Sequence, residues 1–477
     1  MDTEKRLLWF LILTLLILFS FNRFFLGPQK RTLSPPLPQK EIAGSQKEIA
    51  EETPSLEECS EEPWENSYWN VTLCVSRGYV SKLQIKPFKE ALLYQNLFFI
   101  DAQKPFEVKT SSQEISFTSP EFRKKIVVIK PYLWEIEVDN PLKKDLEICS
   151  FEEDKGFYKR YQEFFYKENS SITRIPYSKI KNRQTFTNLQ FLGLRDRYYT
   201  LAILNPPPGE YFLEKRKKKL ILVYKPSLNA SSFKAQIFIG PQEMKVLQDY
   251  GLTEIMYFGF FHGIARLILK TLYFGFQIFK NWGVAIIFVS SLIYLLLFPL
   301  TIKSSKSMKK MQELQPQIEE LRKKYKDNPQ KLNKEILELY KQYKINPLGG
   351  CLPLFLQIPI FFALYQVLIR SVEIKGARFL WIKDLSLPDY LIKLPLSLPI
   401  VGDGIHLLPL LMVGLMFFQQ KLTTPKTSAS EQQKLMTFIF PLVFGFIFYR
   451  FPSGLVLYWV CNSLFTFIYQ LRLARVK

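Results

Sequence analysis

The chain has 477 residues, enough for two or more domains, and 48% of them are hydrophobic. Its 64 Lys and Arg outnumber its 43 Asp and Glu, and the net charge of +21 favours anionic partners. A membrane accounts for both properties, whereas charge alone gives little support to DNA binding. The five scattered cysteines lack metal-ligand spacing, and a disulfide among the first three remains open: Cys59, Cys74, Cys149, Cys351 and Cys461.

The N-terminal part predicts a membrane anchor followed by a linker. Residues 7–26 are a run of about twenty apolar residues after Lys5 and Arg6, which is long enough to span a bilayer. No small-residue cleavage site follows, so residues 1–26 are predicted to be an uncleaved signal anchor. Residues 27–63 are rich in Pro, Lys, Glu, Ser and Gln without periodicity, which is typical of a disordered linker.

Residues 64–250 change to short runs of β-branched and aromatic residues, which predict an all-β sandwich domain. Examples are residues 68–75, 125–130, 220–224 and 233–239. A domain this long is exported regardless of its charge. In residues 251–280 apolar side chains recur at three- and four-residue steps. An amphipathic helix in the membrane interface and a buried packing helix both fit that period.

Residues 281–470 contain five further apolar spans, at about 283–301, 349–369, 405–419, 435–449 and 454–469. With the first anchor they predict a polytopic α-helical membrane protein of six transmembrane helices. Acidic side chains are nearly absent from the span interiors. That argues against an ion-coupled transporter, which usually keeps buried carboxylates.

A basic helical hairpin is predicted at 303–345, between the first two of these spans. Asn328 is suited to cap its second helix and Pro329 to begin it. The hairpin cannot lie in the bilayer, so the positive-inside rule predicts that it is cytoplasmic. Its surface suits anionic headgroups, acidic peptides or ribosomal RNA, although on charge alone an ordinary solvated face is the simpler interpretation. Its candidate contact residues are Lys309, Lys310, Lys323, Lys324, Met308 and Met311.

Several polar residues lie inside the apolar spans, among them Ser290, Tyr294, Gln357, Tyr458 and Asn462. Each of them alone is explained by a hydrogen bond to a neighbouring helix. Taken together, they are also compatible with a wet cavity that reaches partway into the bilayer. Such a cavity lowers the cost of moving polar segments through hydrocarbon.

Motifs in these spans resemble the YidC/Oxa/Alb family of membrane protein insertases, of the bacterial YidC type with a large exported domain. The resemblance covers nearly the whole chain and is strong over 281–470. It rests on Asn281-Trp282-Gly283, Phe298-Pro299-Leu300-Thr301, Met308–Met311 with Gln315-Pro316, residues 346–353, Gln357–Phe361, Leu380-Trp381-Ile382 with Asp384-Leu385-Ser386, and residues 451–458. In the exported domain it adds Gly193-Leu194, residues 196–199 and Gly240-Pro241.

The resemblance implies a five-helix insertase core whose groove opens to the cytoplasm and to lipid, and no enzyme activity, metal or cofactor. Nascent membrane proteins are the implied substrates. The Sec translocon, the ribosome and anionic lipids are expected partners. Ser290, Tyr294, Gln357, Tyr458 and Asn462 would line the groove, and the substrate would slide along Phe361, Phe362, Leu435 and Phe438. The implied location is the bacterial inner membrane, with both termini cytoplasmic and the β domain periplasmic.

Two features depart from that family. Tyr294 lies five residues before Pro299, where the family usually has an arginine, so the groove is expected to rely on hydration more than on charge. The expected tail, residues 471–477, is short and basic and lacks the long extension that some members use for ribosome contact.

Two rival interpretations remain. A solute transporter or channel with a carbohydrate-binding-like periplasmic domain predicts buried ionisable residues or internal repeats, and neither is evident. A sugar-active enzyme in the β domain would need a general acid or base, usually histidine. The two histidines, His262 and His406, lie outside residues 64–247 and are interpreted as interfacial side chains.

Overall fold

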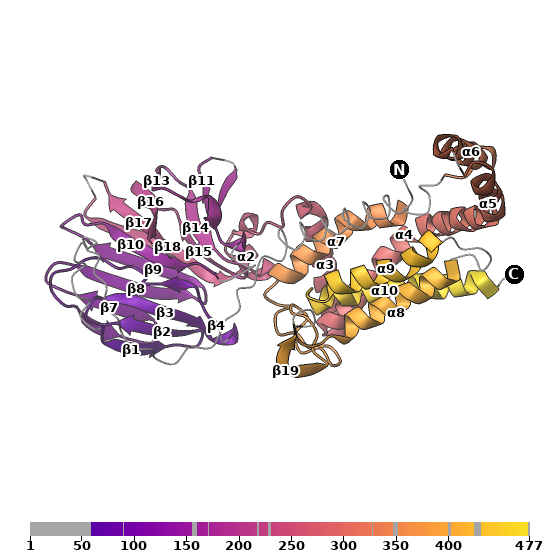
Figure 1. The fold of residues 1–477 in the computed structure, drawn as a ribbon. Helices are drawn as coiled ribbons and strands as arrows, with labels where there is room; N and C mark the ends of the chain where they lie inside the picture. Colours follow the sequence, from indigo (N-terminus) through magenta and orange to yellow (C-terminus); the bar gives the residue numbers. More distant parts are fainter. Residues whose placement is uncertain are drawn as a thin grey trace, which may run out of the picture. The chain divides into compact units, whose positions relative to one another are not determined.

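The computed structural model describes residues 59–475, apart from 89, 155–159, 170, 217–218, 228–229, 327, 347–351, 399–401 and 424–430. The expected signal anchor and most of the expected linker lie outside the described residues. The chain divides into two compact units, Met1–Ile255 and Met256–Lys477 (Figure 1).

The first unit is built from three antiparallel sheets, and this confirms the expected all-β unit. A four-stranded sheet has the order β1 (Glu61–Glu65), β2 (Trp69–Cys74), β3 (Tyr79–Ile85) and β4 (Glu90–Ala91). A five-stranded sheet has the order β13 (Gln184–Phe186), β16 (Gly209–Arg216), β17 (Lys219–Pro226), β10 (Leu146–Glu152) and β5 (Tyr94–Gln95). The nine-stranded sheet has the order β12 (Ile172–Pro176), β11 (Glu163–Lys167), β14 (Phe191–Arg195), β15 (Tyr199–Leu204), β18 (Ser232–Pro241), β9 (Leu133–Asp139), β8 (Arg123–Lys130), β7 (Glu114–Thr118) and β6 (Glu107–Thr110).

Buried aromatic residues join these sheets. The fully buried Tyr94 of β5 donates its hydroxyl to the carbonyls of Leu194 and Tyr199, at 3.0 Å each. Trp69 of β2 packs edge-on against Trp134 of β9, with ring centroids 5.2 Å apart. Each contact crosses from a smaller sheet to the nine-stranded one, and a buried aromatic pair contributes beyond the area it buries. The unit ends in helix α2 (Met244–Asp249) and a 3-10 turn at Thr253–Ile255.

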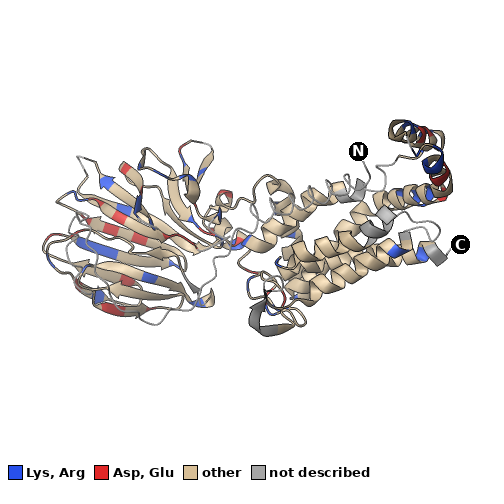
Figure 2. Ribbon diagram, in the orientation of Figure 1, with Lys and Arg blue, Asp and Glu red and all other residues tan. Residues whose placement is uncertain are grey.

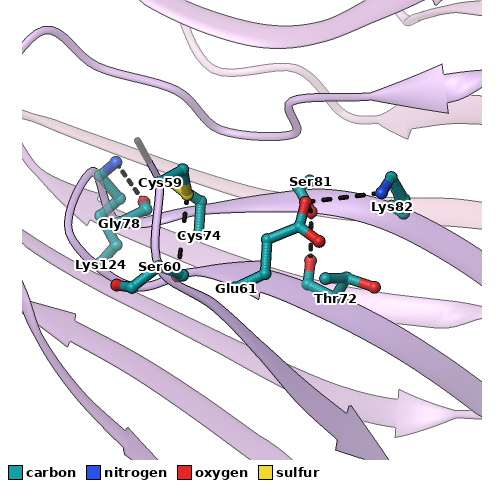
Figure 3. The surroundings of a disulfide bond; sticks show 9 residues. All are labelled: Cys59, Ser60, Glu61, Thr72, Cys74, Gly78, Ser81, Lys82 and Lys124. Atoms are coloured by element: carbon teal, nitrogen blue, oxygen red, sulfur yellow. Dashed lines mark hydrogen bonds and ion pairs between the residues drawn. A yellow bond between two sulfur atoms is a disulfide. The ribbon is translucent and has the colours of Figure 1, made fainter. Parts of the chain in front are cut away.

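A disulfide joins Cys59 to Cys74 and so fastens the chain just before β1 to the end of β2 (Figure 3). The open question about the first three cysteines is thereby answered, since Cys149 is free and buried. The bridge closes a loop of 15 residues. Disulfides persist mainly in oxidising compartments, which agrees with the predicted export of this unit.

Close to the bridge, Lys124 of β8 is completely buried (Figure 3). Its amine donates to the carbonyls of Gly78 and Phe98, at 2.8 and 2.9 Å, and lies 4.6 Å from the ring centroid of Phe106. Burial holds the pKa of the Lys124 amine well below its ordinary value. The two carbonyls thus use two N–H groups of the amine.

Stability of the β unit is therefore expected to depend on pH through Lys124. Between its lowered pKa and the ordinary value of 10.5, the unfolded chain binds a proton that the folded chain lacks. Raising the pH across this window consequently increases the free energy of unfolding. Denaturant titrations of the full chain, read by protease cleavage of the β unit, measure this slope.

Substituting Lys124→Met should remove this pH dependence of the free energy of unfolding. It should also lower the free energy of unfolding by about 1–3 kcal/mol at high pH, because two buried carbonyls lose a donor. Lys125→Met is the matched control, because the Lys125 amine is exposed and pairs with Glu114 at 3.2 Å. If the free energy of unfolding of the Lys124→Met protein depended on pH as in the wild type, another group would be the one that titrates.

The second unit is helical, as predicted. Its helices are α3 (His262–Phe279), α4 (Trp282–Glu313), α5 (Gln315–Lys324), α6 (Pro329–Gln342), α7 (Leu352–Arg370), α8 (Leu407–Thr423), α9 (Glu431–Phe448) and α10 (Ser453–Arg475). Strands β19 (Ile392–Leu398) and β20 (Gly402–Ile405) form a hairpin that sequence analysis did not predict. Only α4 and α10 are both long and apolar enough to cross a membrane among the described residues. The predicted count of six spans therefore stays a prediction.

The basic hairpin differs from its prediction in where its first helix begins. Helix α4 continues without a break through Pro299 to Glu313, and a new helix starts only at Gln315. Pro316 explains the break, because proline lacks an N–H and suits the first turn of a helix. Asn328 caps α6 as predicted, accepting from the Lys331 N–H at 3.0 Å.

A connector, residues 371–391, joins α7 to the β19–β20 hairpin and holds the first turns of three helices. At α4, Asn281 caps the helix by accepting from the Val284 N–H at 3.1 Å. The absent side chain of Gly283 leaves room for the ring of Phe379. These contacts explain Asn281 and Gly283 of the Asn-Trp-Gly motif.

The connector contacts α10 and α8 in a similar way. The Gly454 N–H donates to the Leu385 carbonyl at 2.9 Å, and the Ser453 hydroxyl donates to the Asp384 carbonyl at 3.0 Å. Asp389 accepts from the N–H groups of Leu407 and Leu408, at 2.9 and 3.0 Å. Backbone groups that are otherwise orphaned at helix N-termini are thus satisfied by one segment.

Gly283→Ala tests the connector directly. A methyl group at this position would collide with the Phe379 ring, so we expect a loss of about 1–3 kcal/mol in stability. Thermal unfolding of the purified protein in detergent is the measurement. Gly414→Ala, in α8, is the matched control because nothing lies within 4 Å of the added methyl. Equal melting temperatures for the two variants would contradict the close packing.

Candidate functional site

Helix α10 carries a polar stripe, Tyr458, Asn462 and Thr466, at four-residue spacing. The Asn462 amide donates to the Tyr458 carbonyl at 3.2 Å, and the Thr466 hydroxyl donates to the Asn462 carbonyl at 2.9 Å. Tyr458 is fully buried, whereas Asn462 and Thr466 are half-buried. Residues four apart share one face of a helix, so the stripe runs along α10 from a closed end to a more open end.

Two other helices reach this stripe. From α7, the Gln357 amide donates to the Tyr458 hydroxyl. From α4, the Tyr294 hydroxyl faces the side chain of Thr466. The structure therefore brings together four of the predicted groove residues and adds Thr466, which sequence analysis missed. Its four-residue spacing from Asn462 was the available signal.

Tyr294 combines an apolar body with a polar tip. Its ring packs against Phe298 and Phe465, with centroids 5.7 and 5.2 Å away. Its hydroxyl is buried, and no described residue forms a hydrogen bond of good geometry with it. A buried hydroxyl without such a bond costs free energy unless water or a bound group supplies the partner. The tip of Tyr294 thus marks a position where a polar group from outside the chain is favoured.

Ser290 lies one turn before Tyr294 on α4 and is completely buried. Its hydroxyl donates to the Ile286 carbonyl at 2.7 Å, a bond within its own helix. Within the part of the chain that the structure describes, no hydrogen bond joins Ser290 to the stripe, so Ser290 lies apart from the other predicted groove residues.

The four predicted slide residues occupy different surroundings. Phe361 is half-buried in an aromatic cluster with Phe448, Phe451 and Trp459 at centroid distances of 5.6, 6.1 and 5.9 Å. Phe362 stacks on Phe261 at 6.4 Å. Phe438 of α9 is 57% exposed and contacts Phe417. Leu435 belongs to α9, but its side chain lies outside the described residues.

Charge is concentrated on the hairpin and is sparse on the long helices (Figure 2). Leu314, Ile318 and Ile345 form the buried core of the hairpin, with Met311 packed against it. Met308 is half-buried. The four lysines singled out in the sequence are exposed: Lys309, Lys310, Lys323 and Lys324. The hairpin thus presents cations to solvent while its apolar stripe is used internally.

Helix α3 has three faces. Ala265, Ile268 and Leu272 are buried, and α3 packs on α4 and α7. Arg266 and Lys270 lie on a second, exposed face. The third face is apolar yet exposed, with Phe260, preceding the helix, continuing the face: Phe260, Ile264, Leu267, Phe274 and Ile278. A helix with protein-facing, polar and apolar exposed faces is compatible with both interpretations of residues 251–280, and its position in a membrane interface stays a prediction.

His406 corrects a prediction. Instead of lying at an interface, it is only 4% exposed and is enclosed by Tyr390 and Tyr449, with centroids 4.8 and 4.3 Å away. Its Nδ1 contacts the main-chain carbonyl of Asp389. The contact between His406 and Asp389 depends on the fold of the connector, and no local pattern in the sequence indicates it.

The polar stripe is built for binding rather than for covalent chemistry. It consists of amides and hydroxyls, which donate and accept hydrogen bonds but do not titrate near neutral pH. Among the described residues, no group of three or more His, Cys, Asp or Glu could hold a metal ion. What the arrangement supplies is a row of neutral hydrogen-bonding groups inside an apolar helical unit.

Comparison with known proteins gives a family match for each of the two units. Residues 274–477 match the family model described as the 60Kd inner membrane protein, and residues 130–271 match the YidC periplasmic domain. The chain is 42% identical over 292 residues to the membrane protein insertase YidC of Pelobacter propionicus, covering 58% of this chain and 53% of that relative. It is 36% identical over 326 residues to the YidC of Endomicrobium trichonymphae, covering 64% and 61%.

The chain thus spans about half the length of the curated relatives that it matches. A solved structure described as an active YidC insertase with its first transmembrane domain resolved covers 87% of this chain and 93% of its own, at 18% identity and a TM-score of 0.44. The two family models match adjacent segments that together make up most of the chain, and the relatives agree with them. The chain belongs to the YidC family of 60Kd inner membrane proteins.

Proposed function

We propose that the chain is a membrane protein insertase that moves nascent transmembrane segments from the cytoplasm into the lipid. The observation that carries the proposal is the polar stripe on α10, reached by Gln357 and Tyr294 from two other helices. Each unpaired amide or hydroxyl of a hydrophilic flank costs several kcal/mol in hydrocarbon, on the order of 4–8 by transfer to cyclohexane. A row of neutral donors and acceptors offsets that cost while the flank crosses.

Tyr294 has a specific part in this mechanism. Its buried hydroxyl has no hydrogen bond of good geometry among the described residues, so a water or a peptide group of the substrate that reached it would supply the missing partner. Tyrosine also avoids the cost of a cation in the membrane, about 2.5–3.5 kcal/mol on insertion scales. The groove thus acts by hydration and hydrogen bonding, without a Coulomb attraction for acidic flanks.

The apolar part of the substrate would leave along aromatic side chains. Phe438, which is exposed, is the best placed of the predicted slide residues. Phe361 and Phe362 would act indirectly, by packing, because their rings contact other aromatic rings. Leu435 remains a proposed member of the slide.

The orientation follows from charge and redox chemistry. The exposed lysines of the hairpin favour the cytoplasmic side, where acidic substrate flanks, anionic lipid or a ribosome are available partners. The Cys59–Cys74 disulfide favours the periplasm for the β unit. Both termini are then cytoplasmic, α3 lies in the periplasmic interface, and the Sec translocon is a partner for larger substrates.

A series at Tyr294 tests the groove. Tyr294→Phe keeps the packing against Phe298 and Phe465 but removes the hydroxyl, so we expect insertion to slow about fivefold, equivalent to one hydrogen bond. Tyr294→Ala should be worse, because it also leaves a cavity. Tyr294→Arg should retain activity, since arginine restores a polar tip. Complementation of an insertase-depleted strain and insertion into proteoliposomes are the measurements.

Tyr325→Phe, on the hairpin, is the matched control and should insert substrates at the normal rate. Full activity of Tyr294→Ala would contradict the proposed part of this residue. Wild-type folding of each variant is verified by its melting temperature, which separates a lost groove function from a damaged helical unit.

A further inference from the structure

The connector contains a tight turn whose tip is an exposed leucine. Phe379 and Ile382 exchange two main-chain hydrogen bonds, at 2.9 and 2.8 Å, with Leu380 and Trp381 between them. Leu380 has a φ of 50° and is 75% exposed. A left-handed backbone is costly for a branched apolar residue, and an exposed leucine gains nothing from the protein in return. The turn therefore exposes Leu380 at a cost in conformational free energy, which a partner outside the chain would offset.

The base of this turn is rigidly held. Phe379 packs where Gly283 lacks a side chain, Ile382 is buried, and the Trp381 indole donates to the Asp389 carboxylate at 3.2 Å. Because the residues on both sides of Leu380 are held by the protein, its outward direction is a fixed feature of the fold.

The same contacts place the tip at the level of a membrane boundary. Gly283 is in the first turn of α4, and Asn281, which caps that helix, donates to the Arg378 carbonyl at 3.4 Å. The connector also bonds to the first turn of α10 through Gly454 and Leu385. Helices α4 and α10 are the two described helices long and apolar enough to span a bilayer. The turn thus lies where both begin.

Two exposed cations flank the tip. Arg378 and Lys383 flank the turn, both are exposed, and neither has an ion pair within the described residues. The two nearby carboxylates accept from N–H groups of the protein: Asp384 from Ser386 at 2.8 Å, and Asp389 from Trp381, Leu407 and Leu408. An apolar tip between two free cations matches the boundary between acyl chains and anionic phosphates.

We propose that Leu380 is a lipid anchor: its side chain enters the acyl region of the leaflet at which α4 and α10 begin, and Arg378 and Lys383 meet anionic headgroups. This inference depends on the membrane location of the helical unit and not on the insertase activity. The anchor fixes the height of the connector, and with it the first turns of three helices, relative to the bilayer.

The test uses the full chain with a photoreactive diazirine amino acid at position 380, reconstituted in vesicles of phosphatidylcholine with or without phosphatidylglycerol. After irradiation, mass spectrometry should find lipid adducts at position 380. The matched control places the probe at Leu142, a leucine of the β unit that is 54% exposed, where lipid adducts should be at least about tenfold fewer. Replacing both Arg378 and Lys383 by Gln should lower the preference for phosphatidylglycerol severalfold.

Adducts to a second protein at position 380, or lipid adducts no more frequent than at Leu142, would overturn the proposal. Leu380→Gly provides a second test, because glycine relieves the left-handed backbone. It should raise the melting temperature in detergent but reduce the gain in stability on transfer to vesicles. An equal rise in both media would also contradict the anchor, and either result leaves the proposed insertase activity to be judged separately.

Discussion

The packing of the 371–391 connector onto the first turns of α4, α8 and α10 is the constraint on which the helical unit depends. Lipid provides no hydrophobic force that drives helices together, so close packing and satisfied backbone groups must hold them. The connector supplies both, through the Phe379 ring against Gly283 and through hydrogen bonds to Gly454, Leu407 and Leu408. With these N-termini fixed at one end, the faces of α4 and α10 that carry Tyr294 and Thr466 are directed toward each other.

The properties of the polar stripe follow from its neutral side chains. Neutral amides and hydroxyls cost little to keep in a membrane because each has a helical or interhelical partner, as Gln357 has in Tyr458 and Asn462 has within α10. A site of this kind lowers the barrier for a polar segment without binding it tightly, since no charge attracts it. Weak binding suits the proposed insertase, because its substrate must leave the groove.

The β unit is stabilised differently, because its hydrophobic core is buried away from water. Aromatic contacts tie its smaller sheets to the nine-stranded sheet, and the disulfide fastens its first, mostly exposed edge strand. The buried Lys124 shows that even a titratable group is accepted when two carbonyls use its N–H groups. These features describe a stable exported unit.

Sequence reasoning worked where local patterns decide the structure. Apolar runs predicted the helices α7 to α10, strand-like runs predicted β8 and β18, and Asn328 with Pro329 predicted the start of α6. It did not predict contacts set by distant segments. The burial of His406 depends on Tyr390 and Tyr449, and the meeting of Tyr294 with Thr466 depends on how α4 packs against α10. The unbroken α4 was missed because the apolar span at about 283–301 and the basic hairpin from 303 were treated as separate elements.

The most direct test of the central claim is to catch a substrate on the stripe. A photoreactive residue at Gln357 or Asn462 would be combined with ribosome-stalled nascent chains of a small membrane protein, with Leu410 of α8, which is 51% exposed, as the matched control. The account predicts adducts between both stripe positions and the hydrophilic flank of the nascent segment, and few at Leu410. Normal insertion without adducts at either stripe position would contradict it.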